Sequence, residues 1–128
     1  MSEFYPSTIN RGMIILLPRK AALDWIKTSD EDQDKLTLDD IRQDCDSFLV
    51  PRGEVQDVEG ARKWVFENWE MFLEEFLTDY QPDEERWPEK RTQKLFKDWF
   101  DIHYSSLVWD FVDEPIMHDT DDEDEEEA

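Results

Sequence analysis

The sequence predicts an α+β fold in which a small three-stranded sheet, at least partly antiparallel, packs with helices. Three observations lead to this class: apolar runs of strand length, longer segments whose apolar residues repeat at helical spacing, and a high content of aromatic residues. The 128 residues include six Trp, eight Phe and three Tyr, and each ring can bury roughly 150–250 Å². A chain with this much apolar bulk is expected to fold, although 38% of its residues are charged.

The first part of the chain predicts a strand followed by two helices. Residues 13–17 form a continuous apolar run closed by Pro18, which predicts a strand buried on both faces. Residues 19–28 follow with the apolar spacing of a short amphipathic helix. Residues 37–40 read Thr-Leu-Asp-Asp, a capping box in which Asp replaces the usual Glu, and they predict one or two further helical turns.

The middle of the chain predicts a second strand and one long helix. Residues 47–50, just before Pro51, have the composition of a short strand. Asp57 is the predicted N-cap of a helix that continues to about Thr78. The helix is predicted from apolar residues at helical spacing, among them Val58, Ala61, Val65, Trp69, Phe72 and Phe76.

The last part of the folded region predicts a helix and the third strand. Thr92 is the predicted cap of a helix that ends near Ile102. Residues 105–112 alternate imperfectly between apolar and polar and predict a strand that is antiparallel to at least one neighbour. The two long helices are expected to share one core, which contains Trp69, Phe72 and Trp99.

The chain divides into one domain and two terminal segments. Residues 9–117 are predicted to be a single α+β domain, and residues 1–8 a flexible lead. Residues 118–128 are predicted to be a disordered acidic tail, because eight acids follow one another there with no apolar anchor.

The charge balance sets limits on the partners and the compartment. The chain has 35 acidic and 14 basic residues, a formal net charge of -21 and a sequence pI near 4.2. Eight of the acids lie in the tail, so the rest of the chain still carries about -13. This excess disfavours direct binding to nucleic acid or to anionic membranes. A single cysteine and the lack of a signal-peptide pattern predict a cytoplasmic protein.

Few residues are candidates for catalysis. Asp101 and His103 could form an acid–imidazole pair, but a histidine near a helix end is also stabilised by the helix dipole, so a structural role is favoured. Cys45 is flanked by Asp44 and Asp46, which are expected to raise its pKa and leave the thiol inert. No catalytic residue is therefore predicted.

No metal site or cofactor site is predicted either. A transition-metal site needs clustered His and Cys, and no such cluster exists. The alternating acids from Asp119 lack the glycine and the terminal glutamate of an EF-hand loop. The three glycines are isolated, whereas phosphate-binding loops are glycine-rich.

One basic cluster interrupts the acidic composition. Five bases lie within twelve positions around Trp87 and Pro88: Arg86, Lys90, Arg91, Lys94 and Lys97. A basic stripe with aromatic residues can bind nucleic acid. In a chain of this net charge, pairing with the protein's own acids is the preferred interpretation.

Two segments carry a resemblance to known proteins. The first contains Ile9-Asn10-Arg11, Leu17-Pro18-Arg19 and Trp25, and the second contains Trp87-Pro88, Arg91, Phe96, Trp99-Phe100, Ser106, Val108 and Asp110. Together they resemble a family of small acidic bacterial proteins with no assigned activity. The resemblance covers roughly residues 9 to 115 and implies one compact domain without assigned catalytic residues.

The sequence favours a non-enzymatic interaction module that binds a basic protein surface, either by imitating DNA or by neutralising a toxin. Electrostatic steering speeds the encounter of such a protein with a cationic partner. The predicted contact residues are acids on helices: Glu67, Glu70 and Glu74 on one side of the long helix, with Asp39 and Asp40 on the short one. The alternatives are a small enzyme that uses Asp101 and His103, a homodimer of structural role, or acidity that serves only solubility.

Overall fold

The computed structural model describes residues 3–53 and 55–119, and it confirms the α+β class. The described helices are α1 (Lys20–Ser29), η1 (Glu31–Gln33), α2 (Leu38–Gln43), α3 (Val58–Glu67), α4 (Trp69–Tyr80), η2 (Glu84–Arg86) and α5 (Gln93–Trp99). The described strands are β1 (Ser7–Thr8), β2 (Arg11–Pro18), β3 (Ser47–Pro51), β4 (Phe100–Ser105) and β5 (Trp109–Asp110). The predicted tail falls almost wholly outside the described residues.

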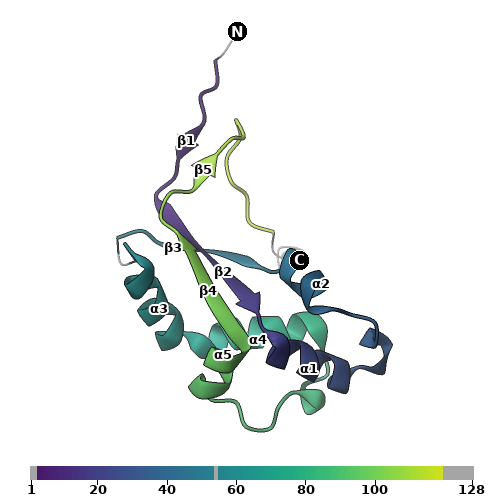
Figure 1. Ribbon diagram of the computed structural model, residues 1–128. Helices are drawn as coiled ribbons and strands as arrows, with labels where there is room; N and C mark the ends of the chain where they lie inside the picture. The colour runs from purple at the N-terminus through teal and green to yellow at the C-terminus, as the bar shows by residue number, and fades with distance from the viewer. Residues whose placement is uncertain (1–2, 54, 120–128) are drawn as a thin grey trace, which may run out of the picture.

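A three-stranded antiparallel sheet of order β3-β2-β4 forms the centre of the fold (Figure 1). Ile14 of β2 lies between Phe48 of β3 and Tyr104 of β4, so these three side chains share one face of the sheet. Ile14 is fully buried, whereas the neighbouring Ile15, on the other face, is only half-buried. The prediction of a strand buried on both faces is therefore wrong, because only one face of β2 is fully covered.

The predicted helix caps are confirmed. The Thr37 hydroxyl accepts the Asp40 backbone N–H at 3.1 Å, and the Asp40 carboxylate accepts the Thr37 N–H at 3.0 Å, which completes the capping box of α2. Asp57 accepts the Gly60 N–H at 2.7 Å at the start of α3. Thr92 accepts the Leu95 N–H at 3.1 Å at the start of α5. Each cap satisfies a backbone donor that the first helical turn leaves without a partner.

The predicted long helix is wrong as a single element, because it breaks at Asn68 into α3 and α4. In a continuous helix the Asn68 N–H would donate to the Trp64 carbonyl. Here it donates to the Val65 carbonyl at 3.0 Å, and the Asn68 side-chain amide donates to Trp64 O at 2.8 Å instead. The Gln93 side chain donates to the Phe66 carbonyl at 2.9 Å. Side-chain amides thus replace the missing helical hydrogen bonds, and α3 and α4 run in different directions (Figure 1).

The third strand begins earlier than predicted. The helix predicted to reach Ile102 ends at Trp99, and β4 starts at Phe100, whose backbone is already extended. From Phe100 to Ser105 every residue pairs with β2, from Pro18 to Met13. This pairing outweighs the tendency of α5 to continue, because it buries Phe100 and hydrogen-bonds the β4 backbone.

The predicted third-strand segment instead contains the short strand β5. Thr8 pairs with Trp109 and Ser7 with Asp110, so β1 and β5 form a small antiparallel ribbon. The ribbon extends away from the body of the molecule (Figure 1). The end of the predicted flexible lead therefore takes part in strand pairing.

The predicted core around the helices is confirmed. Phe72 and Trp99 are buried, and Trp69 packs against the same cluster from a half-buried position. A smaller buried cluster of Leu23, Ile26 and Ile41 joins α1 to α2. Within residues 3–53 and 55–119 no helix combines the length and the apolar character needed to cross a bilayer.

Candidate functional site

Asp101 and His103 lie on the exposed side of β4 rather than at a helix end. Their side chains alternate with the half-buried Ile102 and Tyr104, as strand geometry requires. Asp101 is 3.9 Å from the guanidinium of Arg19, the residue between β2 and α1, so it forms an exposed ion pair with this base. Neither residue lines the cavity described below.

The five predicted contact acids lie on three different helices. Glu67 ends α3 and is 3.8 Å from Lys63, whereas Glu70 and Glu74 lie beyond the break, on α4, beside Glu89 and Arg91. The break removes the continuous i, i+3, i+7 row that was predicted for Glu67, Glu70 and Glu74.

Both acids on α2 make contacts within their own helix. Asp40 completes the capping box, and the hydrogen bonds from Thr37 lower the pKa of its carboxyl. Asp39 accepts a hydrogen bond from the Gln43 side chain at 2.9 Å. The Asp40 carboxylate is therefore already hydrogen-bonded at the start of α2.

The basic cluster is largely engaged within the protein. Two of its members pair with acids, Arg86 with Asp83 at 3.8 Å and Lys94 with Asp98 at 3.0 Å. Two others lie over aromatic rings, Arg91 over Trp87 at 5.6 Å and Lys97 over Phe66 at 4.6 Å. The preferred interpretation, pairing with the protein's own acids, is confirmed for Arg86 and Lys94.

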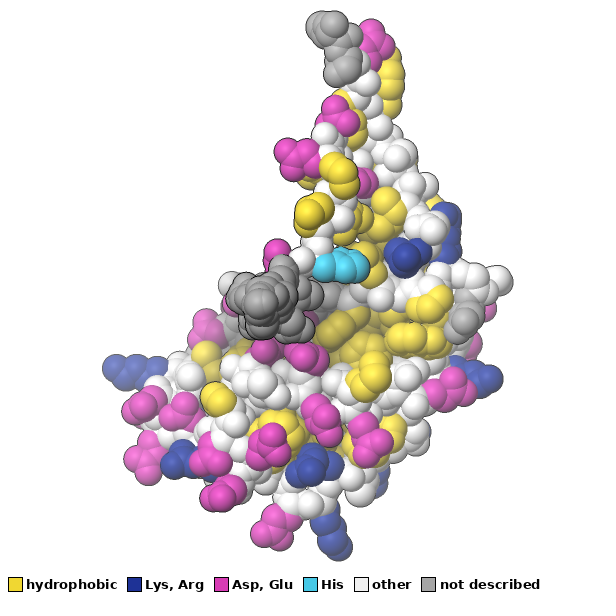
Figure 2. All heavy atoms as spheres, turned by 180° about the vertical axis from the view of Figure 1, so that it is seen from behind, with side chains coloured by type: hydrophobic (Ala, Val, Ile, Leu, Met, Phe, Trp, Pro, Cys, Tyr) yellow, Lys and Arg dark blue, Asp and Glu magenta, His cyan; other side chains and the backbone are white. Residues whose placement is uncertain are grey.

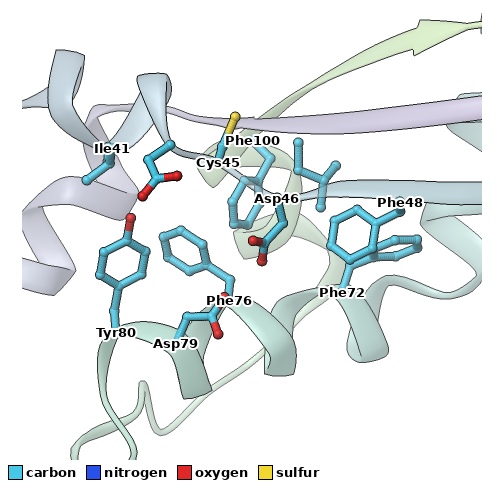
Figure 3. Close-up of a pocket in the computed structure, with 11 residues that line it drawn as sticks. Ile41, Cys45, Asp46, Phe48, Phe72, Phe76, Asp79, Tyr80 and Phe100 are labelled. Carbon is cyan, nitrogen blue, oxygen red and sulfur yellow. The ribbon is translucent and has the colours of Figure 1, made fainter. Parts of the chain in front are cut away.

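A cavity of about 320 Å³ lies between the end of α2, the edge strand β3 and helix α4 (Figure 3). The end of α2, the link that follows it, β3 and α4 supply most of the wall, and β2 and β4 contribute one residue each. The lining side chains are Leu16, Ile41, Asp44, Cys45, Asp46, Phe48, Phe72, Phe76, Asp79, Tyr80 and Phe100.

The floor of the cavity is aromatic and firmly packed. Phe48 meets Phe72 edge to face with ring centroids 4.8 Å apart, and Phe76 meets Phe100 in the same way at 4.9 Å. Phe72 and Phe100 are buried, and Phe48 and Phe76 are half-buried, so the latter two expose part of their rings. The floor therefore offers an apolar surface without need of rearrangement.

The mouth of the cavity is acidic. Asp44 and Asp46 flank the link from α2 to β3, and Asp79 lies in the last turn of α4. Figure 3 shows the Asp46 and Asp79 side chains directed into the space between β3 and α4. None of the residues that line the cavity is a Lys, an Arg or a His.

The acidic mouth changes the proton affinity of its own groups. Partial burial, a hydrogen bond with Asp46, and the negative charges of Asp46 and Glu75 raise the pKa of Asp79 to about 6. Burial, followed by the charges of Asp44 and Asp46, raises the pKa of the Tyr80 hydroxyl. Helix α4 has no base in its last turn, where the helix dipole is also negative. The negative charges at the mouth therefore favour the binding of a cation.

Cys45 lies at the same site and is poorly suited to nucleophilic chemistry. Burial is the main cause that raises the pKa of its thiol, with a further contribution from Asp46. The thiol also donates a hydrogen bond to the Arg42 carbonyl at 3.4 Å. The predicted direction of this pKa change is confirmed. Among the described residues no group of three His, Cys, Asp or Glu side chains is placed to hold a metal ion.

Acidic side chains are spread over much of the face shown in Figure 2. Hydrophobic side chains gather in a hollow near the middle of this face, with acidic side chains mainly below it and Lys, Arg and His side chains above it. Comparison with known proteins adds no assignment: no family model, curated protein or solved structure matches this chain. The resemblance noted in the sequence is therefore not supported by a family match.

The sequence did not predict the mouth acids as a group. In the sequence, Asp44 and Asp46 stand out only as neighbours of Cys45, and no local pattern distinguishes Asp79 from the other acids. Their proximity depends on the packing of α4 beside β3, and the sequence alone does not specify this packing. The one local signal is the Asp-Cys-Asp sequence that links a helix to a strand.

Proposed function

We propose that this chain is a non-enzymatic acidic interaction module that binds a basic surface of another protein. The observation that carries the proposal is the acidic mouth: Asp79 lies on α4, Asp44 and Asp46 lie in the short link between α2 and β3, and no base is among the residues that line the cavity. A cationic partner supplies the charge that this site lacks, and its approach is accelerated by the overall charge of -21.

The distribution of ion pairs supports the same proposal. The described residues contain five ion pairs, all between exposed side chains, and none involves an acid of the mouth. Exposed pairs of this kind contribute little to stability. Each pair engages one acid, so most acids of the described residues take no part in an ion pair among these residues. Carboxylates in fixed positions can match the positions of bases on a partner's surface. Acids on a flexible segment attract cations but do not select a particular arrangement of them.

The test begins with the full chain immobilised and exposed to lysate of its host at low and at high salt. We expect the retained proteins to be basic and to be lost at high salt, because screening weakens charge attraction. Retention of mainly neutral or acidic proteins, unaffected by salt, contradicts the proposal.

Association rates with a purified retained protein then locate the contact. Three variants are compared: Asp44, Asp46 and Asp79 changed together to Asn, Glu67, Glu70 and Glu74 changed together to Gln, and a chain without residues 119–128. The two triple variants remove the same charge from different faces, since Glu74 and Asp79 are roughly 140° apart around α4. We expect the Asn variant to bind most weakly and the shortened chain to associate only modestly more slowly. Loss of binding on tail removal alone means that the folded domain merely carries the tail.

A further inference from the structure

We propose that the cavity between α2, β3 and α4 binds a basic segment of a partner protein, taking one apolar side chain onto its aromatic floor and the adjacent Lys or Arg side chains at Asp44, Asp46 and Asp79. This inference rests on the proposed function and names the site and the chemistry of its partner.

The size and the floor of the cavity favour an apolar anchor. A cavity of about 320 Å³ lies at the small end of the range for ligand sites, which suits a single large side chain rather than an extended cofactor. Its floor includes the exposed parts of Phe48 and Phe76, and these rings are fixed by their edge-to-face contacts with Phe72 and Phe100. A hydrated inorganic cation gains nothing from such a floor, whereas an aromatic or aliphatic side chain does.

The charges around the mouth require the anchor to have cationic neighbours. The charged groups that face Asp79 are Asp46, just before β3, and Glu75 on its own helix, and both are acidic. At the end of α2, Asp44 adds another carboxyl, and burial raises the pKa of the Cys45 thiol. Arg42, a base in the last turn of α2, donates an Nη1 hydrogen bond to the Pro18 carbonyl at 3.1 Å and does not line the cavity. A purely apolar ligand would further desolvate these carboxylates, whereas a flanking ammonium or guanidinium pairs with them.

The position of the cavity favours a segment of a protein over a free amine. β3 is an edge strand of the three-stranded sheet, and among the described strands only β2 pairs with it. An extended segment can bind alongside such an edge and place alternate side chains into an adjacent pocket. The cavity begins at this edge, because Phe48 of β3 and Asp46, which directly precedes β3, both line it.

The experiment uses the full chain and three capped heptapeptides as probes. The first probe alternates Lys and Ser around a central Phe, the second has Ala in place of Phe, and the third has Gln in place of every Lys. Titrations followed by ¹H–¹⁵N NMR give the affinity and the backbone amides that shift. We expect the first probe to bind about tenfold more tightly than either of the others, with shifts confined to β3, α4 and the link after α2.

A matched pair of double variants tests the residues. Changing Asp46 and Asp79 to Asn is expected to weaken the first probe about fivefold or more, whereas changing Glu70 and Glu74 to Gln removes the same charge and leaves its affinity nearly unchanged. Both variants are conservative in shape, and their amide spectra verify that each is folded.

Each outcome has a distinct meaning. Equal loss in both double variants indicates binding by net charge alone, which overturns this inference and leaves the proposed function intact. Equal binding of the Phe and Ala probes overturns the apolar anchor. Phenethylammonium, tested in parallel, overturns the peptide assignment if it binds as tightly as the first probe. Failure of all probes, together with no retained basic protein in the capture experiment, contradicts the proposed function as well.

Discussion

At the scale of single residues, the position of the Tyr104 ring depends on the absence of a side chain at Gly12. A Cβ atom at Gly12 would lie 3.0 Å from a ring carbon of Tyr104 and 3.2 Å from its hydroxyl oxygen. Tyr104 lies opposite the neighbouring Ile14 on β2, and its hydroxyl donates a hydrogen bond to the Val55 carbonyl. This bond holds the ring in place, so the ring cannot move away from an added methyl group without breaking it.

We therefore expect Gly12→Ala to lower the free energy of unfolding by roughly 1–3 kcal/mol, the usual cost of overpacking. Gly53→Ala is the matched control, because nothing lies within 4 Å of the position its Cβ would take. The measurement is urea unfolding of both variants. In a Tyr104→Phe background the cost of Gly12→Ala is expected to shrink, because the ring is then free to shift. An unchanged cost in that background rules out the Tyr104 contact as the cause.

Asp79 predicts a dependence of stability on pH. Its pKa is about 6 in the folded protein and lies above the ordinary value of 3.8, so the folded state holds more protons between these two values. The carboxyl therefore lowers stability as pH rises through this window, and its full cost is present above about pH 6. We expect Asp79→Asn to raise the free energy of unfolding by roughly 1 kcal/mol near neutral pH. This is less than the full pKa shift implies, because solvent screens a partly exposed group.

The gain from Asp79→Asn is expected to vanish near about pH 4, where the carboxyl is neutral in the folded state. Asp34→Asn, at an exposed position, serves as the control that removes the same charge elsewhere. Urea unfolding at several pH values measures both. A gain for Asp79→Asn that is the same at every pH contradicts this explanation.

At the scale of elements, the break between α3 and α4 decides which side chains reach the core and which reach the cavity. A continuous helix would have kept Glu67, Glu70 and Glu74 in one row. The break instead allows α3 to pack near β4 and α4 near α5. It depends on amides from Asn68 and Gln93 that satisfy the carbonyl groups of Trp64 and Phe66.

Asn68→Asp tests the role of this amide. The two side chains have nearly the same shape, but Asp has no donor and places a negative charge beside the Trp64 carbonyl. We expect a loss of about 1–3 kcal/mol in the free energy of unfolding, since a part-buried carbonyl loses its partner. Gln93→Glu at its exposed position is expected to cost less, because water can replace its amide. A change within about 0.5 kcal/mol for Asn68→Asp shows that the break is maintained by packing alone.

At the scale of the whole molecule, the excess of acid opposes compactness. With 35 acids and 14 bases, repulsion between like charges exceeds the attraction of the exposed ion pairs. Salt screens both the repulsion and the attraction. Because the repulsion is larger, added salt is expected to stabilise the folded protein.

We therefore expect the melting temperature to rise by about 2–5 °C between roughly 20 and 300 mM NaCl. A chain without residues 119–128 keeps a formal charge of about -13, and it is expected to show a smaller rise. Thermal unfolding followed by circular dichroism measures both chains. A melting temperature that falls with salt means that attractive ion pairs dominate instead.

The sequence by itself determined those features that depend on neighbouring residues: the acidity, the caps at Thr37, Asp57 and Thr92, and the periodicity that places β2, β3, α1 and α5. Local signals suffice there because the hydrogen bonds of a cap and the alternation of a strand lie within a few residues. The tertiary structure decided where helix gives way to strand at Phe100, where the long helix breaks, and which acids meet. Asp46 and Asp79 lie in separate segments, and they meet at one cavity only because α4 packs beside the β3 edge. No local pattern records that contact, because its free energy arises from burial between segments that are distant in the chain.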